Sequence, residues 1–401
     1  MQNHQRENFY MVSTSYPSAN IELLLQKFVF VLYLLIGATL NKIHRSEYMS
    51  AEMEELESLA AKVGGDAAGA LGVLLAYIGD QAGVYRALDE LGPVTIAQLA
   101  KETTLDERYL QEFLSANAGH GYVDYHPGDE TFDMSTAQAA VFAREGQPTC
   151  MQGFFQAIVS QYATHETALE TFKSGQGRAW GDHDQCCFCG TDRFFRPGYE
   201  ANILEHWIPS LSGVEQKLIA GGKVADIGCG HGTSTIMMAK AFPNATFHGF
   251  DFHAPSVEAA TNNAKAEGVS NVQFFESAAK EMPDNQYDFA CIFDALHDMG
   301  DPVGAATRIF EVLGDDATLM LVEPMAEDSL QANLEKNPMS STYYSFSTLV
   351  CVPTSKAQEV GLQLGAQAGQ ARLTRVLEQA GFTKVRRASS NAANMVLEVK
   401  A

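Results

Sequence analysis

A glycine-rich turn after a short apolar stretch constrains the fold of this chain more than any other feature. A buried strand is expected over 224–227 and a helix over 234–241, within the run Lys223-Val-Ala-Asp-Ile-Gly-Cys-Gly-His-Gly-Thr-Ser-Thr235. Glycine lets the turn adopt positive φ and lets a ligand approach bare backbone. The helix N-terminus adds free N–H groups and a positive dipole end. The run therefore predicts a nucleotide-type pocket at the carboxyl end of a parallel strand.

The spacing of the glycines argues against a dinucleotide ligand. A G-x-G-x-x-G fingerprint would place its third glycine at position 233, which is Thr233. Asp226, inside the strand, would repel a pyrophosphate, whereas it suits a ligand that carries an ammonium and a sulfonium. This acidic strand, followed by a G-x-G-x-G turn, resembles the first motif of the class I S-adenosylmethionine-dependent methyltransferases. A tight strand-to-helix turn with no ligand is the alternative. The turn glycines are Gly228, Gly230 and Gly232.

The rest of residues 221–401 follows the order of elements in that family. Strands alternate with helices, which predicts an α/β fold with a doubly wound, mostly parallel sheet. The resemblance implies seven strands in a Rossmann-like methyltransferase domain. Beyond the first strand, the strands are expected over 245–250, 272–275, 287–293, 318–322, 383–387 and 394–399.

The resemblance implies S-adenosyl-L-methionine as the cofactor. Asp251, at the tip of the second strand, would hold both ribose hydroxyls, since an ionised carboxylate only accepts hydrogen bonds. Phe252 follows it, and Ser277 and Ala278 stand where the family holds the adenine. Asp294 stands where a carboxylate would meet the ammonium or sulfonium. The glycine turn and Asp226 would surround the methionine part.

The segment after the fourth strand resembles the His-Asp segment of small-molecule O-methyltransferases. It reads Asp294-Ala-Leu-His-Asp-Met-Gly-Asp-Pro302. By that match His297 is the general base, and an ordinary histidine pKa of about 6.5 suits this task. Glu323, at the tip of the fifth strand, would orient it. A histidine that only holds the loop is the alternative. Met299 replaces an aromatic residue of the family in the acceptor pocket.

Residues 149–220 are expected to be a helical connector or cap. The segments 175–183 and 194–199 resemble parts of a winged-helix-bearing methyltransferase subgroup that lie over the cofactor. Amphipathic aromatic residues in this region suit a substrate pocket, and wedging two domains together is an equal alternative. The aromatic candidates are Trp180, His183, Tyr199 and Trp207. The insertion over 325–369 is expected to cap the acceptor or to pack against the N-terminal module.

Residues 51–148 predict a winged-helix domain. A pair of helices, opened by the capping residues Thr95 and Asp106, precedes two short strands. The module fused to the catalytic core resembles the arrangement in small-molecule O-methyltransferases, where it dimerises and roofs the active site. The resemblance thus implies a homodimer. Two helices are expected over 65–77 and 80–91, and the four winged-helix elements follow over 93–100, 106–118, 122–125 and 131–134.

Charge argues against DNA binding by this module. Its second helix carries Asp106, Glu107 and Glu112, and phosphates would repel a recognition helix of this kind. The formal net charge of the chain is −22, which acts in the same direction. We therefore expect no nucleic-acid partner, and a dimerising or substrate-covering module is favoured.

Residues 1–50 are expected to be an extension that contains an apolar segment. The uncharged run over 28–40 is shorter than the about 20 residues of a membrane span. A membrane tether through 21–40, an uncleaved signal-like segment and an extension absent from the working protein are the alternatives. Since a good soluble sequence begins at Met49, the last is favoured, and the expected location is cytoplasmic.

The cysteines indicate a reduced, intracellular chain. There are seven, an odd number, and Cys229 and Cys291 fall in the glycine turn and in a core strand, positions that do not suit a disulfide framework. Cys186, Cys187 and Cys189 cluster near His183, but no fourth ligand or second C-x-x-C pair is visible. We expect no metal.

These features predict S-adenosylmethionine-dependent methyl transfer to a small acceptor, more at oxygen than at carbon or nitrogen. A non-catalytic protein that binds cofactor or an apolar ligand, as a sensor or partner subunit, is the alternative. A DNA-binding regulator is opposed by the acidic module.

Overall fold

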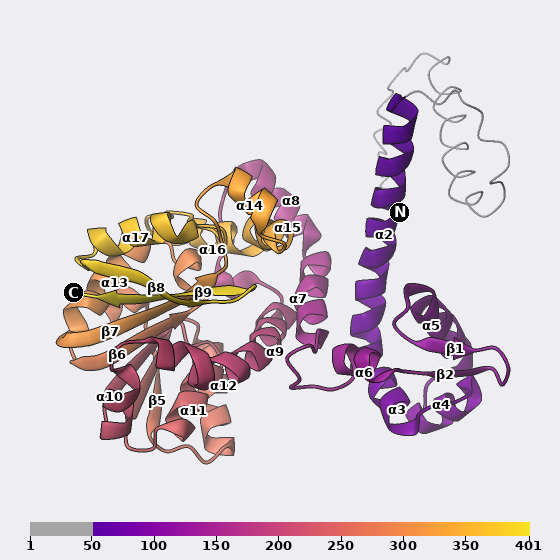
Figure 1. Cartoon of the computed structure of the whole chain (residues 1–401), viewed down its shortest axis with the longest axis horizontal. Helices are drawn as coiled ribbons and strands as arrows, with labels where there is room; N and C mark the ends of the chain where they lie inside the picture. Colours follow the sequence, from indigo (N-terminus) through magenta and orange to yellow (C-terminus); the bar gives the residue numbers. More distant parts are fainter. Residues whose placement is uncertain (1–50) are drawn as a thin grey trace, which may run out of the picture. The chain divides into compact units, whose positions relative to one another are not determined.

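The computed structural model describes residues 51–401, and the apolar segment over 21–40 lies outside the described residues (Figure 1). The chain divides into two compact units between Gly72 and Val73, and each is considered by itself. The boundaries expected for the four segments of the chain remain predictions. Helix α2 (Ala51–Gln81) crosses the division. Of the described helices, it is the one long and apolar enough, over Glu52–Gln81, to cross a membrane by length and composition.

A seven-stranded sheet forms the centre of the second unit, as predicted. The strand order is β5-β4-β3-β6-β7-β9-β8, and β9 alone runs antiparallel to its neighbours. The chain leaves β3 toward β4 on one side and later returns to β6 on the other. Because the order reverses at β3, a crevice opens outside the carboxyl ends of these strands. The strands are β3 (Lys223–Ile227), β4 (Thr246–Asp251), β5 (Val272–Glu276), β6 (Tyr287–Phe293), β7 (Leu313–Pro324), β8 (Lys384–Ser390) and β9 (Asn394–Lys400).

Helices cover both faces of this sheet (Figure 1). Strand β6 is buried on both faces: Ala290 and Ile292 pack on one side, and Phe289 and Cys291 on the other. This double burial explains why the strand reads as a continuous apolar run. The core around Ala290 and Ile292 includes side chains of α13 (Pro302–Val312) and α17 (Gly369–Gln379). The core around Phe289 and Cys291 includes side chains of α10 (Val214–Ala220) and α11 (Thr233–Ala241). Helix α12 (Ala254–Ala266) contacts β4 and β5.

The winged-helix elements form where the sequence predicts them, with shifted ends. Thr95 accepts a hydrogen bond from Gln98 N–H in a capping box, and Asp106 accepts from two backbone N–H groups. Leu88, Leu99 and Leu114 are fully buried in a core of their own. The elements are α3 (Val84–Leu91), α4 (Ile96–Thr103), α5 (Glu107–His120), β1 (Asp124–His126), β2 (Thr131–Asp133) and α6 (Thr136–Phe142).

The start of this region differs from the expectation. Helices were expected over 65–77 and 80–91, whereas α2 continues to Gln81 and the next helix begins at Val84. Gly83 has φ +73, so the break falls at the residue that adopts left-handed backbone without steric cost.

The connector and the insertion are helical. Helices α7 and α9 pack closely through Gly153 and Gly190, where a Cβ atom would come within 2.4 Å and 2.5 Å of backbone nitrogen in the facing helix. The helices of the connector are α7 (Gln152–Ala163), α8 (His165–Ser174) and α9 (Gln185–Asn202). Those of the insertion are α14 (Leu330–Lys336), α15 (Ser340–Phe346) and α16 (Val352–Lys356).

Arg193 of α9 links three segments of the second unit. Its guanidinium donates to Asp80 at 2.6 Å and 3.0 Å and to Glu145 at 2.7 Å and 2.5 Å. The side chains of Arg193 and Asp80 are only 22% and 15% exposed, so solvent screens this pair less than a surface pair. The two carboxylates raise the pKa of Arg193 in spite of the burial that lowers it.

Replacing Arg193 by methionine should lower the free energy of unfolding by about 2 kcal/mol, because Asp80 keeps its burial and loses its partner. Arg108→Met is the matched control, since Arg108 and Glu112 are 67% and 69% exposed. It should change stability by no more than about 0.5 kcal/mol. Urea unfolding followed by circular dichroism measures both, and equal losses would contradict the account.

Candidate functional site

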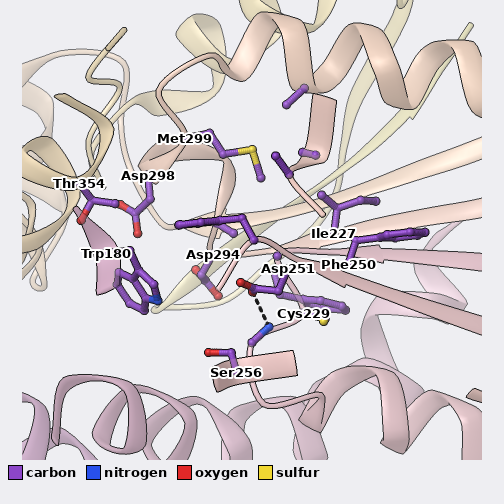
Figure 2. Close-up of a pocket in the computed structure, with 18 of the residues that line it drawn as sticks. Trp180, Ile227, Cys229, Phe250, Asp251, Ser256, Asp294, Asp298, Met299 and Thr354 are labelled. Atoms are coloured by element: carbon purple, nitrogen blue, oxygen red, sulfur yellow. Dashed lines mark hydrogen bonds between the residues drawn. The ribbon is translucent and has the colours of Figure 1, made fainter. Parts of the chain in front are cut away.

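A cavity of about 460 Å³ lies outside the carboxyl ends of the central strands. Figure 2 shows side chains from β4, from the turn after β3 and from the segment after β6 around one space. Most of the lining is apolar, and carboxylates stand out among the polar groups. The lining carboxylates are Asp192, Asp251, Asp294, Asp298, Asp301 and Glu359.

The three glycines of the turn have different tasks. All adopt positive φ: +74 at Gly228, +53 at Gly230 and +79 at Gly232. A Cβ at Gly232 would meet Phe274 at 2.7 Å and Ala260 at 2.9 Å, whereas a Cβ at Gly230 would meet nothing within 4 Å. Gly228 and Gly230 line the cavity, and Gly232 is not among the lining residues. Gly232 therefore serves close packing, and Gly230 leaves room beside the cavity.

Asp226 lies behind the turn and is not among the residues that line the cavity. Its Oδ2 accepts hydrogen bonds from the hydroxyls of Ser234 at 2.8 Å and Thr235 at 2.6 Å. Burial raises its pKa to about 6, although these hydroxyls lower it. This position fits the alternative of a tight strand-to-helix turn. The side chain links β3 to the start of α11 and does not line the cavity.

Asp251 faces the cavity at the end of β4, as predicted. Its Oδ2 accepts from Gly230 N–H at 2.9 Å, the dashed line in Figure 2. Its Oδ1 accepts from His253 N–H, also at 2.9 Å. A carboxylate has about four acceptor sites, so two remain after these bonds. Burial raises its pKa, and the two N–H groups oppose that shift. The residue can therefore accept two further donors, such as vicinal hydroxyls.

Asp294 is a second buried carboxylate on the cavity wall. Its backbone has φ +49, uncommon outside glycine. Asn394 of β9 donates to it at 2.8 Å, and the Tyr199 hydroxyl donates at 3.4 Å. Burial, followed by the charge of Glu323, raises the pKa of Asp294 to about 8. A cationic ligand group beside it would favour the ionised form.

The other predicted pocket residues divide into two groups. Phe252, Ser277, Ala278, Trp180, Tyr199 and Met299 line the cavity. His183 lies behind the wall, where its Nε2 is 3.4 Å from Thr354 Oγ1, and burial lowers its pKa to about 4. Trp207 is 1% exposed and packs in the core beneath β6.

Sequence reasoning identified Tyr199 and the segment 194–199 of α9 but missed Phe188 and Asp192 of the same helix. Phe188, Asp192, Phe195 and Tyr199 line the cavity and recur at helical spacing. That periodicity could have identified the face. Thr354 and Gln358 reach the cavity from the far end of the insertion, and no local pattern marks them.

His297 and Glu323 come together as predicted, but His297 is not among the lining residues. The imidazole Nδ1 is 2.5 Å from Glu323 Oε2, and Glu323 Oε1 accepts from Leu296 N–H at 3.0 Å. His297 Nε2 lies 3.3 Å from Asp298 Oδ1. Burial lowers the pKa of His297, but the two carboxylates outweigh it and raise the pKa well above its usual value.

The cysteine cluster noted in the sequence differs from the group of possible metal ligands that lie close together in the structure. All seven cysteines are free thiols, and Cys186, Cys187 and Cys189 lie on α9. Over residues 51–401, the side chains whose donor atoms lie close enough to bind a metal are His297, Asp298 and Cys351, within 4.8 Å of one another. Burial raises the pKa of Cys351 to about 12, which keeps it a neutral thiol. The expectation of no metal remains a prediction.

The residues around the cavity fit S-adenosyl-L-methionine. Asp251 has two acceptor sites left for a ribose, and Gly230 leaves open space where a Cβ would stand. Asp294 offers a buried carboxylate to a positive charge. These features suit a nucleoside whose tail carries an ammonium and a sulfonium.

Comparisons with known proteins agree with this architecture. Residues 219–381 match the family described as Methyltransferase domain, and residues 69–144 match the Rv2258c-like winged HTH domain. Mitomycin 7-O-methyltransferase MmcR is 17% identical, with a TM-score of 0.65 over 87% of this chain and 99% of that one. Human N-acetylserotonin methyltransferase, solved with SAM, is 15% identical, with a TM-score of 0.63 over 89% and 99%. At such identities the likeness shows the fold.

Curated relatives match short stretches. Ribosomal RNA small subunit methyltransferase G of Bacteroides fragilis is 35% identical over 82 residues, which are 20% of this chain and 40% of that protein. The chain spans 40% and 14% of the lengths of the first two curated relatives.

Substitutions at Gly232 and Gly230 are expected to affect different properties, stability at Gly232 and cofactor binding at Gly230. Gly232→Ala should lower the free energy of unfolding by about 3 kcal/mol, because left-handed backbone and overpacking both cost energy. Gly230→Ala should cost only about 1 kcal/mol in stability, since its Cβ meets no atom, yet should weaken cofactor binding. Urea unfolding and titration calorimetry distinguish the two variants. Equal stability losses would contradict this division.

Proposed function

We propose that this chain transfers a methyl group from S-adenosyl-L-methionine to a hydroxyl of a small, largely apolar acceptor. Residues 219–381, which match the Methyltransferase domain, and residues 69–144, which match the Rv2258c-like winged HTH domain, support the proposal. One observation carries the proposal. Asp251 stands at the carboxyl edge of the sheet, bonded to Gly230 N–H, with acceptor sites open to a cavity of nucleoside size.

The chain's own residues account for cofactor binding in this proposal. Asp251 accepts the ribose hydroxyls, and the turn at Gly228 and Gly230 lies against the methionine part. Asp294 faces its positive charge, and Phe252 with Ser277 and Ala278 surrounds the adenine. The bound cofactor supplies an electrophilic methyl group. Alignment of acceptor and methyl can contribute about 7–11 kcal/mol to lowering the barrier.

The residues that line the cavity wall opposite the sheet indicate the chemical class of the acceptor. Trp180, Phe188, Phe195, Tyr199 and Met299 give it an aromatic and apolar character. The lining carries many carboxylates and few basic groups, so an anionic acceptor would be repelled. A neutral or cationic aromatic compound fits best. The printed names of the two structural neighbours, both of which act on small molecules, agree with this choice.

Methylation of a hydroxyl requires a proton to leave, and we assign this task to the cluster of Asp298, His297 and Glu323, in which His297 and Glu323 support the group that lines the cavity. The bond of 2.5 Å to Glu323 holds the ring, and Nε2 points to Asp298. General acid–base assistance contributes typically about 10²–10⁴-fold in rate. His297, the base predicted from the sequence, does not line the cavity, so its influence on the acceptor passes through Asp298, which does.

Partners and location complete the proposal. We propose a homodimer, a small-molecule acceptor, no nucleic-acid partner and a cytoplasmic catalytic domain. The acidic face of α5, with Asp106 as its cap and Glu107 in its first turn, supports the exclusion of DNA. A tether through residues 21–40 stays an alternative for the location.

Asp251→Ala tests the function directly. The variant should bind S-adenosylmethionine at least about 100-fold more weakly, because two charge-assisted hydrogen bonds of about 1.5 kcal/mol or more each are lost. Calorimetry measures affinity, and labelled-methyl transfer to a panel of phenols and hydroxy acids measures activity. Unchanged affinity in the variant would refute the cofactor site. Binding by the wild type without transfer to any acceptor would favour the non-catalytic alternative.

Cofactor affinity should rise with pH up to about 8. The free protein holds a proton on Asp294 below that pH, and a cationic ligand favours the ionised carboxylate, so binding releases the proton. The affinity should increase by up to about tenfold per pH unit and then level off. Calorimetry in buffers of different ionisation enthalpy counts the released proton. Asp294→Asn should flatten the profile; a slope that persists in this variant would assign the proton to another group.

A further inference from the structure

Three side chains lead from the cavity wall into the sheet, and from their placement we propose that Asp298 takes the proton from the acceptor, with His297 and Glu323 as positioning residues behind it. The inference rests on the proposed function and assigns the group that touches the acceptor. The side chains of Asp298, His297 and Glu323 are 21%, 5% and 2% exposed. Of the three, only Asp298 lines the cavity.

The inner two residues have no freedom to approach the acceptor. Both oxygens of Glu323 are engaged, one by Leu296 N–H at 3.0 Å and one by His297 Nδ1 at 2.5 Å. This bond holds the imidazole, whose Nε2 lies 3.3 Å from Asp298 Oδ1 without a hydrogen bond between them. A base must lie within hydrogen-bond reach of the proton that it removes. His297 does not line the cavity, whereas Asp298 does.

Asp298 combines an anchored backbone with a carboxylate that adjoins His297 and Cys351. It ends the single helical turn Leu296–Asp298 after β6, and its carbonyl oxygen accepts from Gln358 at 3.0 Å. Its Oδ1 is buried and makes no hydrogen bond within residues 51–401. Since Oδ1 is buried and lies near His297, we assign the contact with the acceptor to Oδ2. Figure 2 shows this carboxylate beside Thr354 and above Trp180, on the wall assigned to the acceptor.

The charges around His297 explain why Asp298, and not His297, accepts the proton. The titratable groups near the imidazole are Glu323, Asp298, Asp294 and Cys351. Two carboxylates adjoin the ring, which therefore holds both protons at neutral pH and has no free nitrogen to accept another. The resulting imidazolium favours the ionised form of Asp298 in spite of its burial.

The step balances in atoms and charge. The acceptor O–H bond breaks and its proton binds Oδ2 of Asp298. The acceptor oxygen forms a bond to the methyl carbon, whose bond to sulfur breaks with the electron pair remaining on sulfur. One negative carboxylate and one positive sulfonium become a neutral acid and a neutral thioether. His297 keeps its protons, and bulk water later takes the proton from Asp298.

The test compares two acceptors in Asp298→Asn. A phenol of ordinary pKa, about 10, must lose a proton, whereas a nitrophenol is already ionised in the assay. Both are used at saturating concentration, because the carboxylates of the cavity weaken the binding of an anion and only kcat is compared. The variant should lose about 10²–10⁴-fold in kcat with the first and less than about tenfold with the second. Asp284→Asn is the charge-matched control, since Asp284 is 98% exposed, and it should leave both rates unchanged. Cofactor affinity by calorimetry should stay within about threefold in all proteins.

A second readout uses the protein without cofactor. NMR titration of the His297 ring should show an apparent pKa that falls in Asp298→Asn and stays unchanged in Asp284→Asn, because one of the two adjoining carboxylates is lost. Equal losses with both phenols, full activity in Asp298→Asn, or an unchanged ring titration would each overturn the assignment. If the wild type binds cofactor but methylates no acceptor, the proposed function itself fails, which is a different result.

Discussion

The bend between β3 and α11 is the constraint on which the rest of the molecule depends. Three alternate residues adopt left-handed backbone there, and Asp226 ties the strand to the helix through Ser234 and Thr235. The bend brings Gly230 N–H to Asp251 at the neighbouring strand. A side chain at position 232 would collide with Phe274, so the helix could not approach the sheet. The cavity exists because this packing leaves bare backbone at its floor.

Buried carboxylates give the cavity its character. The chain carries a formal charge of −22, and several of its acids line one space of about 460 Å³. Burial raises the pKa of Asp251, Asp294 and Asp298 together. Their repulsion and desolvation disfavour the empty site, and a cation relieves both. The same physics selects a cationic cofactor, disfavours an anionic acceptor, and prepares one carboxylate to receive a proton.

Most of the fold of residues 221–401 could be predicted from the sequence. The glycine turn, the alternation of strands and helices, and the terminal strand pair predicted a doubly wound sheet and its strands, and the resemblance placed Asp251 and Asp294 at the cofactor. The partnership of His297 with Glu323 followed from family resemblance, and its distance of 2.5 Å agrees. Asp226, Gly232 and His183 were expected at the ligand and lie behind the wall. A one-dimensional pattern identifies a motif but does not show which of its residues face inward.

The sequence alone determined the fold class, because strand periodicity, turn glycines and helix caps such as Thr95 act over a few residues. Tertiary structure alone decided which groups surround the acceptor. Thr354 and Gln358 reach the cavity across the insertion, and Phe188 reaches it from the connector, since helices far apart in sequence close over the sheet. It also decided that Asp298, and not His297, lines the cavity, because Glu323 holds the imidazole behind the wall. Local chemistry sets the elements, and the direction of a side chain depends on partners that only packing brings near.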